Sequence, residues 1–212
     1  MESTGKYWSS VFNILEKSCS VTLAHPKYTK PQKGNKPDRK DAKWICDLFM
    51  CDMIKPCFIP SPEIRQLRTL VRYHVKLTNM LTGKKNRTQN CLTFSTLKLD
   101  DVFSDTFRKS ARSITNYILE HPSETFDVSP FVDPRCKTPV SEIQAAVDGA
   151  VSPEQNVKLR QCLAHIDKLE AHQKESESEI LQITEPFSAV LDLLYTLPGL
   201  DKNPMTAIAI LS

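Results

Sequence analysis

Acidic side chains that could ligate a metal ion occur at two places in the first 41 residues. In the segment KPDRKDA, Asp38 and Asp41 lie three residues apart at the expected start of a helix. Side chains at that spacing project from one helix face. Glu2, in MESTGKYW, is expected at a strand end before a helix, where α/β domains commonly place a metal-binding carboxylate. Because carboxylate oxygens suit Mg²⁺, these three residues predict a site for a divalent cation.

The same residues also have a structural interpretation. An aspartate at a helix start caps the first turn, and a second acid in that turn is stabilised by the helix dipole. Glu2 could equally be a solvated acid near the chain start. The spacing of Asp38 and Asp41 leaves the metal site and the cap open as alternatives.

Positive charge is concentrated in the first part of the chain and surrounds these acids. Residues 1–120 hold 21 Lys and Arg against 11 Asp and Glu, a net charge of +10, whereas residues 121–212 hold 7 against 14, or −7. Such a basic segment favours a polyanionic partner, and the acidic remainder favours a solvated helical or interaction element. The cations expected to bind nucleic acid beside the acids are Lys36, Arg39 and Lys40.

A second group of cations lies on a long helix predicted for residues 63–92. At 100° per residue, its members fall within about 80° of one another, opposite a face of leucine and valine. They could bind phosphates or form an ordinary solvated face. This basic stripe consists of Arg65, Arg68, Arg72 and Lys76.

Composition excludes several classes of protein. Only 5 residues of 212 are glycine, which argues against a P-loop or a dinucleotide fingerprint. No apolar run is long enough for a membrane span, and the polar start is no signal peptide. The 7 cysteines form no CxxC pair, so zinc is not expected, and Cys46 and Cys51 are predicted to be reduced, buried core residues. The expected location is the cytoplasm, with no membrane partner.

The predicted elements favour an α/β unit followed by mostly helical structure. A helix over 6–17, a strand over 21–26 and a helix over 38–54 form the α/β part. The helix over 63–92 follows, with a possible interruption at Gly83, and then a helix over 104–120. Four prolines mark residues 121–140 as a linker.

Heptad spacing indicates a coiled coil, or a long antiparallel hairpin, beyond Pro153. Apolar residues recur at the first and fourth heptad positions from Leu159 to Leu197, with a polar layer at Gln173 and Ser176. Residues 154–183 are therefore expected to pair between chains, giving a homo-oligomer, or against the helix over 63–92. Pro186 is expected to begin a new helix.

Four separated motifs carry a resemblance to a known family. In chain order they are ESTGKYW; HP followed by KGNKPDRKDAKWI; IPSPEIRQLRTLVRYHVKL; and YTLPGL. In this order they resemble the transposases of the insertion-sequence family numbered one hundred and ten, the DEDD recombinases whose relatives are guided by a bridge RNA. Where the family has KTD, this chain has KPD, and the proline fixes the backbone before Asp38.

The resemblance implies a RuvC-like, RNase-H-type domain that binds Mg²⁺. It also implies DNA and a guide RNA as partners, and a serine nucleophile in a later domain. Glu2 matches the family glutamate, and Asp38 and Asp41 match its last two aspartates. The implied organisation is a partial RuvC-like catalytic domain at 1–60, a basic helical region at 61–121, a linker and short helix at 122–152, a coiled coil at 153–185, and the start of a C-terminal transposase domain at 186–212.

Two family residues have no counterpart in this sequence. The first aspartate belongs upstream of ESTG, and the serine belongs downstream of the LPG segment. The expectation is therefore a transposase truncated at both ends, whose catalysis and Mg²⁺ binding are weak or absent. Two alternatives stay open: a non-catalytic helical protein that binds nucleic acid, and a coiled-coil interaction module.

Overall fold

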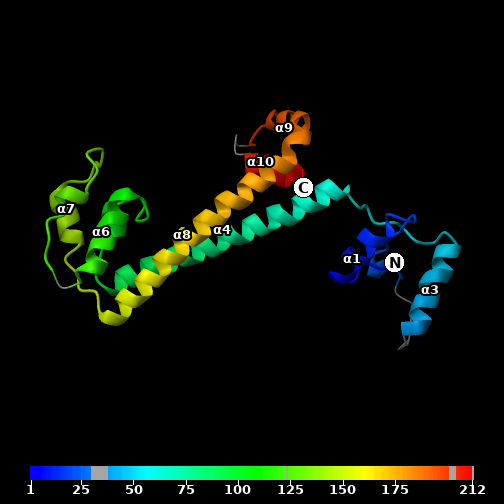
Figure 1. Cartoon of the computed structure of the whole chain (residues 1–212), viewed down its shortest axis with the longest axis horizontal. Helices are drawn as coiled ribbons and strands as arrows, with labels where there is room; N and C mark the ends of the chain where they lie inside the picture. The colour runs from blue at the N-terminus through cyan, green and yellow to red at the C-terminus, as the bar shows by residue number, and fades with distance from the viewer. Residues whose placement is uncertain (30–37, 123, 201–203, 212) are drawn as a thin grey trace. The chain divides into compact units, whose positions relative to one another are not determined.

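The chain is mostly helical and forms two compact units. The computed structural model describes residues 1–29, 38–122, 124–200 and 204–211 (Figure 1). The first unit spans Met1–Pro62 and the second spans Glu63–Ser212.

The first unit combines short helices with a few paired backbone segments. Its helices are α1 (Tyr7–Leu15), α2 (Pro26–Thr29) and α3 (Asp38–Met50). Glu2 forms a parallel bridge with Ala24, which also forms an antiparallel bridge with Pro56. The predicted strand over 21–26 is reduced to this one-residue bridge. Within the described residues there is no strand, so the α/β and RNase-H-type sheet prediction is not confirmed there.

Helix α3 ends four residues earlier than predicted, in a Schellman motif. Asp52 adopts a positive φ of 55°. The Met53 N–H donates to the Leu48 carbonyl at 2.9 Å, and the Asp52 N–H donates to the Phe49 carbonyl at 3.1 Å. These bonds satisfy carbonyls that the last helical turn would otherwise leave unpaired.

The prediction that Cys46 and Cys51 are core residues is wrong. Both thiols are free and exposed, as is Cys19. The apolar residues around them are also largely exposed, and Phe49 and Met50 keep 56% and 79% of their surface. Their hydrophobic neighbours in sequence therefore do not form a core around these two thiols.

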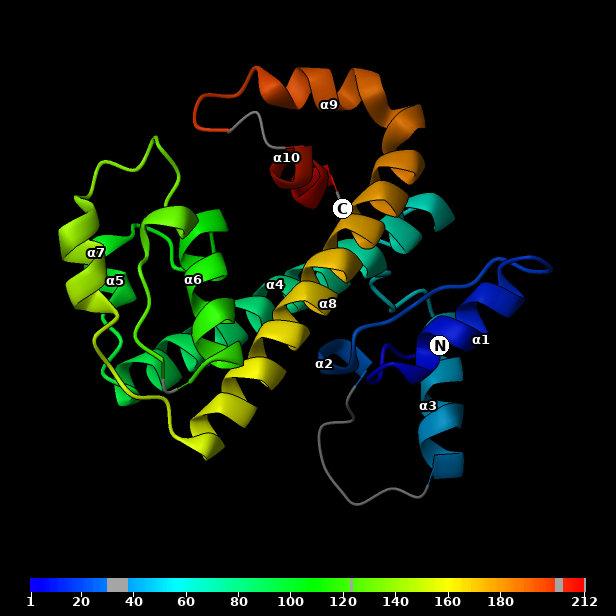
Figure 2. The ribbon, with the colours of Figure 1, turned by 60° about the vertical axis from the view of Figure 1, so that its left-hand side comes forward.

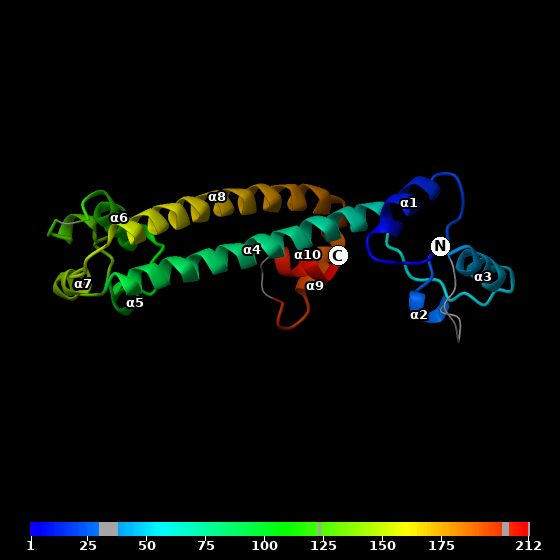
Figure 3. The same ribbon diagram turned by 90° about the horizontal axis from the view of Figure 1, so that it is seen from below.

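Two long helices, α4 (Pro62–Phe94) and α8 (Pro153–Thr184), dominate the second unit. Each begins with proline and an acid in the first turn, which suit the unpaired N–H groups and the positive end of the helix dipole. Gly83 does not interrupt α4, which continues through it for 33 residues, or about 50 Å. Figure 3 shows the two helices running side by side in opposite directions.

Pairing of α4 with α8 buries the apolar heptad positions of α8. Near one end, Leu67 of α4 packs in a cluster with Ile180 of α8. Near the other end, Leu92 of α4 packs in a larger cluster with Leu159 and Ile166 of α8. The antiparallel hairpin within one chain is thus observed, whereas a coiled coil between chains stays a prediction.

The predicted polar layer lies between the two helices and is hydrogen-bonded. Ser176 is 8% exposed, and its Oγ lies 2.9 Å from Nδ1 of His74. The Gln173 Nε2 group donates to Thr78 Oγ1 at 2.8 Å. Because the partners come from opposite helices, this layer favours one register of the hairpin.

A small helical cap closes one end of the hairpin and shares the larger apolar cluster with it (Figure 1). It comprises α5 (Leu99–Val102), α6 (Lys109–Glu120), the 3₁₀ turn η1 (Ser129–Phe131) and α7 (Val140–Ala146). Helix α6 begins five residues later than predicted. The expected linker contains η1, and its Phe126 and Phe131 rings pack with Tyr117 of α6.

At the other end, α8 gives way to η2 (Glu185–Phe187), α9 (Ser188–Tyr195) and α10 (Pro204–Leu211). Pro186 lies in η2, at the boundary where a new helix was predicted. Figure 2 shows α10 beside the end of the hairpin. There Ile208, fully buried, packs with Leu67 and Ile180.

Candidate metal and nucleic-acid site

Backbone hydrogen bonds fix the position of Glu2 in the first unit. The Ser3 N–H donates to the Ala24 carbonyl at 2.8 Å, and the Ala24 N–H donates to the Met1 carbonyl at 2.8 Å. The terminal amino group donates to the Thr22 carbonyl at 2.8 Å. Glu2 therefore lies on a paired segment rather than on a free chain end.

Two threonine hydroxyls orient the Glu2 carboxylate. Thr29 Oγ1 donates to Glu2 Oε1 at 2.7 Å, and Thr4 Oγ1 donates to Oε2 at 3.0 Å. Each carboxylate oxygen keeps a lone pair, so both remain able to ligate a cation. Thr29 is 2% exposed, which restricts its side chain and hence the carboxylate that it holds.

The same threonine connects Glu2 to α3, the helix that begins with Asp38. The Trp44 Nε1 group on α3 donates to the Thr29 carbonyl at 2.9 Å. Trp44 follows Asp41 by three residues, so the two side chains lie about 60° apart on α3. Asp41 and Trp44 are half-buried and Leu48 is buried, which identifies this face as the inner one. Asp41 is therefore on the side of α3 that is bonded toward Glu2.

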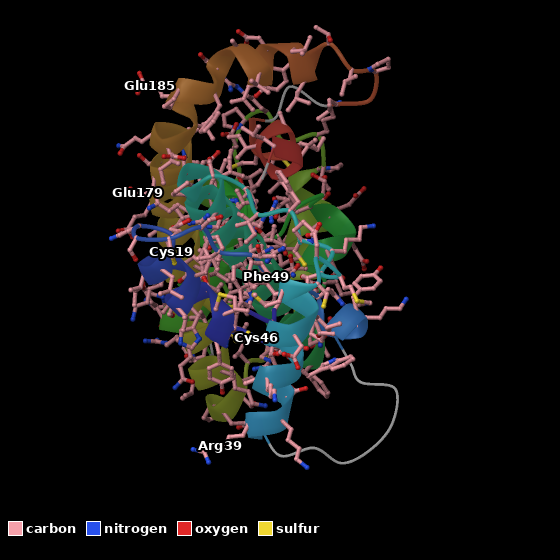
Figure 4. The ribbon with its side chains drawn as sticks, turned by 90° about the vertical axis from the view of Figure 1, so that its right-hand side faces the viewer. Cys19, Arg39, Cys46, Phe49, Glu179 and Glu185 are labelled. Carbon is pink, nitrogen blue, oxygen red and sulfur yellow. The ribbon has the colours of Figure 1, made fainter. Side chains whose placement is uncertain are left out.

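Of the remaining predicted residues of the first unit, some lie within the part of the chain that the structure describes and others lie outside it. The Asp38 side chain and the whole of Lys36 lie outside the described residues. Arg39 and Lys40 are exposed on α3. Figure 4 shows Arg39 near the start of α3, with its side chain extending away from the helix. The cations thus occupy the outer face, and Asp41 occupies the inner one.

The basic stripe on α4 lies in the second unit and is not uniform. Arg65 and Arg68 are half-buried and interact with neighbouring groups. Arg72 and Lys76, one and two turns further on, are exposed. The exposed pair is therefore the part of the stripe that is open to a ligand.

The donor chemistry of the first unit fits Mg²⁺, because Glu2 and Asp41 supply hard carboxylate oxygens from ordered backbone. In the described part of the chain, no three His, Cys, Asp or Glu side chains lie close enough together to hold a metal ion. The predicted set includes Asp38, whose side chain is outside that part. Glu2 and Asp41 are thus the two acids of the predicted set whose side chains are described.

Thr4 and Thr29, which donate to Glu2, and Trp44, which bonds α3 to the Thr29 carbonyl, were not predicted from the sequence. Thr4 stands within the ESTG motif and could have been noticed there. The spacing of Thr29 and Trp44 in the sequence does not indicate their role, because that role comes from tertiary hydrogen bonds. None of the described helices combines the length and apolar character needed to cross a bilayer.

Comparison with known protein families gives a match over the first part of the chain. The model of the DEDD transposases of insertion sequence IS110, described as "Transposase", matches residues 1–96. This match covers the first unit and all of α4. Residues 1–96 are therefore similar to the transposases of that family. No curated protein and no solved structure gives a significant match.

Proposed function

We propose that this transposase-family chain acts on DNA in a Mg²⁺-dependent recombination reaction, with Glu2, Asp38 and Asp41 as metal ligands. The observation that carries the proposal is the hydrogen-bonded link from Glu2 through Thr29 to Trp44 of α3. It ties two acidic segments that are far apart in sequence to one local structure. The similarity of residues 1–96 to a transposase family independently supports a transposase role.

The residues of the chain have distinct roles in this proposal. Thr29 and Thr4 hold the Glu2 carboxylate in one orientation, and Trp44 fixes the inner face of α3, which carries Asp41. When bound, Mg²⁺ would supply Lewis-acid stabilisation to phosphoryl oxygens. Arg39 and Lys40 on the outer face of α3, with Lys36, would bind the DNA backbone near the start of this helix through charge-assisted hydrogen bonds to phosphates.

Metal binding by the full chain tests the acidic site directly. Electron paramagnetic resonance of Mn²⁺, a spectroscopic substitute for Mg²⁺, should show a bound ion. Glu2→Gln and Asp41→Asn should each weaken Mn²⁺ binding at least tenfold, because each removes a hard charged ligand. Asp47→Asn is the matched control, since Asp47 is an exposed acid on another side of α3. Equal affinity for all four proteins would overturn the metal assignment.

Phosphate binding is tested separately with duplex DNA. Replacing Arg72 and Lys76 by Gln should reduce the slope of log affinity against log salt by about 2, since each phosphate contact contributes about 0.9. Lys168→Gln, an exposed substitution on α8, should leave the slope unchanged. An unchanged slope in the double variant would mean that the stripe is only solvated. Salt-dependent binding without any metal site would favour a non-catalytic nucleic-acid-binding protein.

Two further partners belong to the proposal. A guide RNA is expected from the family, and its phosphates would compete with duplex DNA for the same cations. A homo-oligomer is expected if the heptad face of α8 pairs with another chain as well as with α4. Light scattering of the purified chain measures its molecular mass and so tests whether it forms an oligomer.

A further inference from the structure

A groove lies between the last turns of α4 and the first turns of α8, well along the hairpin from the basic stripe. Its cavity has a volume of about 380 Å³. Helix α4 contributes Lys84, Arg87 and Phe94, and α8 contributes Gln155, Lys158 and His165. On each helix the contributing positions recur at spacings of three and four residues, so the groove follows two facing helix surfaces.

Three cations give the groove a positive charge, although Lys158 also interacts electrostatically with Glu154 one turn earlier on α8. No acidic residue lines it. Within the described residues, Lys84, Arg87 and Lys158 form no ion pair. The adjacent Lys85 differs, because its Nζ lies 3.5 Å from Glu170 and 5.2 Å from the centre of the Phe107 ring. Two neighbouring lysines on α4 are therefore used differently, one for internal packing and one facing the groove.

Cations from both helices influence the same side chain in the groove, the thiol of Cys91. Cys91 lies in the groove, and burial raises the pKa of its thiol, with a further increase from nearby Cys162. Lys158 and Arg87 both oppose this rise. Arg87 is on α4 and Lys158 is on α8, so the two charges converge across the groove.

Two other features indicate a ligand with flat aromatic rings and hydrogen-bond donors. Phe94, at the end of α4, is 80% exposed beside these cations. The Gln155 side-chain oxygen is buried and has no hydrogen-bond partner within the described residues, an arrangement that costs free energy until a donor is supplied. An acidic peptide would pair with the cations but would leave the aromatic ring unused.

We propose that this groove binds a single-stranded stretch of nucleic acid, with Lys84, Arg87 and Lys158 on phosphates and Phe94 stacked on an unpaired base. Cations along a groove combined with an exposed aromatic ring are the usual features of single-strand binding. Duplex nucleic acid buries its base faces, so it cannot use Phe94. The residues that line this groove differ from the proposed metal ligands and from those of the basic stripe.

The test measures binding of a fluorescent twelve-nucleotide strand, as RNA and as DNA, to the full chain. Binding of the corresponding duplex and of adenosine monophosphate is measured in parallel. Phe94→Ala should weaken single-strand binding about tenfold, by loss of one stacked base, and leave duplex binding unchanged. Replacing Arg87 and Lys158 by Gln should reduce the single-strand salt slope by about 1.4. The RNA and DNA arms identify which strand the groove prefers.

Matched controls keep the outcome specific. Tyr73→Ala removes another exposed aromatic ring of α4, and Lys168→Gln removes an exposed cation of α8, both outside the groove. All variants change exposed residues, and circular dichroism verifies their folding. Unchanged single-strand affinity in both groove variants, or an equal loss for duplex, would overturn the proposal. So would adenosine monophosphate binding as tightly as the strand. The basic stripe is tested with duplex DNA and with substitutions of Arg72 and Lys76. The groove proposal and the stripe proposal can therefore fail independently.

Discussion

At the scale of single residues, hydrogen bonds from distant parts of the sequence hold Glu2 and the helix that carries Asp41. Glu2 and Asp41 could be selected from their type and their motifs, because carboxylates with nearby cations suggest metal and phosphate. The groups that hold them, Thr29 and Trp44, bond across 27 and 15 residues of sequence. Nothing in the local pattern marks either contact, so only the folded chain identifies them.

The role of Thr29 leads to a prediction about metal affinity. Thr29→Val keeps the side-chain shape but removes the hydroxyl that orients Glu2 Oε1. Loss of such an outer hydrogen bond typically weakens metal binding about 10- to 100-fold. Mn²⁺ titration should therefore show at least a tenfold loss. Thr22→Val is the control, because Thr22 bonds to the chain start only through its carbonyl. Equal affinities for both variants would remove Thr29 from the site.

The cysteines give a second prediction at this scale. Cys19, Cys46 and Cys51 are exposed, whereas Cys91 and Cys162 are buried. Burial also raises the pKa of Cys91, so less thiolate is present near neutral pH. Brief alkylation at pH 7.5, followed by mass spectrometry of peptides, should label the first three at least tenfold faster. Comparable labelling of Cys91 in the folded chain would contradict the burial described here.

The raised pKa of Cys91 also makes the stability of the folded chain depend on pH. The folded state favours the neutral thiol, so its contribution to stability is present below the ordinary thiol pKa and decreases as the pH rises through the raised value. Stability of the Cys91→Ser variant, which does not titrate there, should fall less between pH 8 and 10. Urea unfolding at both pH values measures the difference.

At the scale of elements, the turn between α7 and α8 packs against the end of α4. Thr96 adopts a φ of 57°, and the Leu97 N–H donates to the Leu92 carbonyl at 3.0 Å in a Schellman motif. Gly149 lies so close that a β-carbon there would overlap the Ser95 carbonyl and Thr96 Oγ1. Gly149→Ala should lower the free energy of unfolding by about 1–3 kcal/mol. Gly83→Ala, which faces open space, should not destabilise the chain.

Heptad spacing predicted which face of α8 is buried but not which helix covers it. Leu159, Ile166 and Ile180 are buried as expected, yet the same pattern suits a second chain equally well. The partner was decided by the long helix α4 and by the His74–Ser176 hydrogen bond between the helices. Local periodicity contains no information on such long-range pairing.

Leu169 tests the pairing of these helices. It is 8% exposed, and Leu169→Asp would bury an unpaired charge at the seam. The free energy of unfolding should fall by about 3 kcal/mol or more, beyond the usual range for point substitutions. Ala171→Asp, at an exposed position of α8, is the control. If the molecular mass by light scattering also falls, α8 pairs between chains, and an unchanged mass with lower stability means pairing within one chain.

At the scale of the whole molecule, the two units differ in how much they bury. In the first unit, the described buried apolar residues are Phe12, Leu23, Ala24 and Leu48, and several large apolar side chains of α1 and α3 are exposed. The second unit contains two apolar clusters, one of which joins the hairpin to its helical cap. Composition gave a single apolar fraction for the chain and could not show this unequal division.

This division predicts different folding of the two units when each is prepared separately. A segment of residues 63–212 contains both clusters and should unfold cooperatively on heating, with a helical circular dichroism spectrum. A segment of residues 1–62 has the size at which a single small core is marginal, so it should show a broad transition or none. Calorimetry of the two segments and of the full chain measures this directly. A sharp transition for residues 1–62 would mean that its few buried residues and backbone bridges suffice, and that the acidic site is supported by this unit alone.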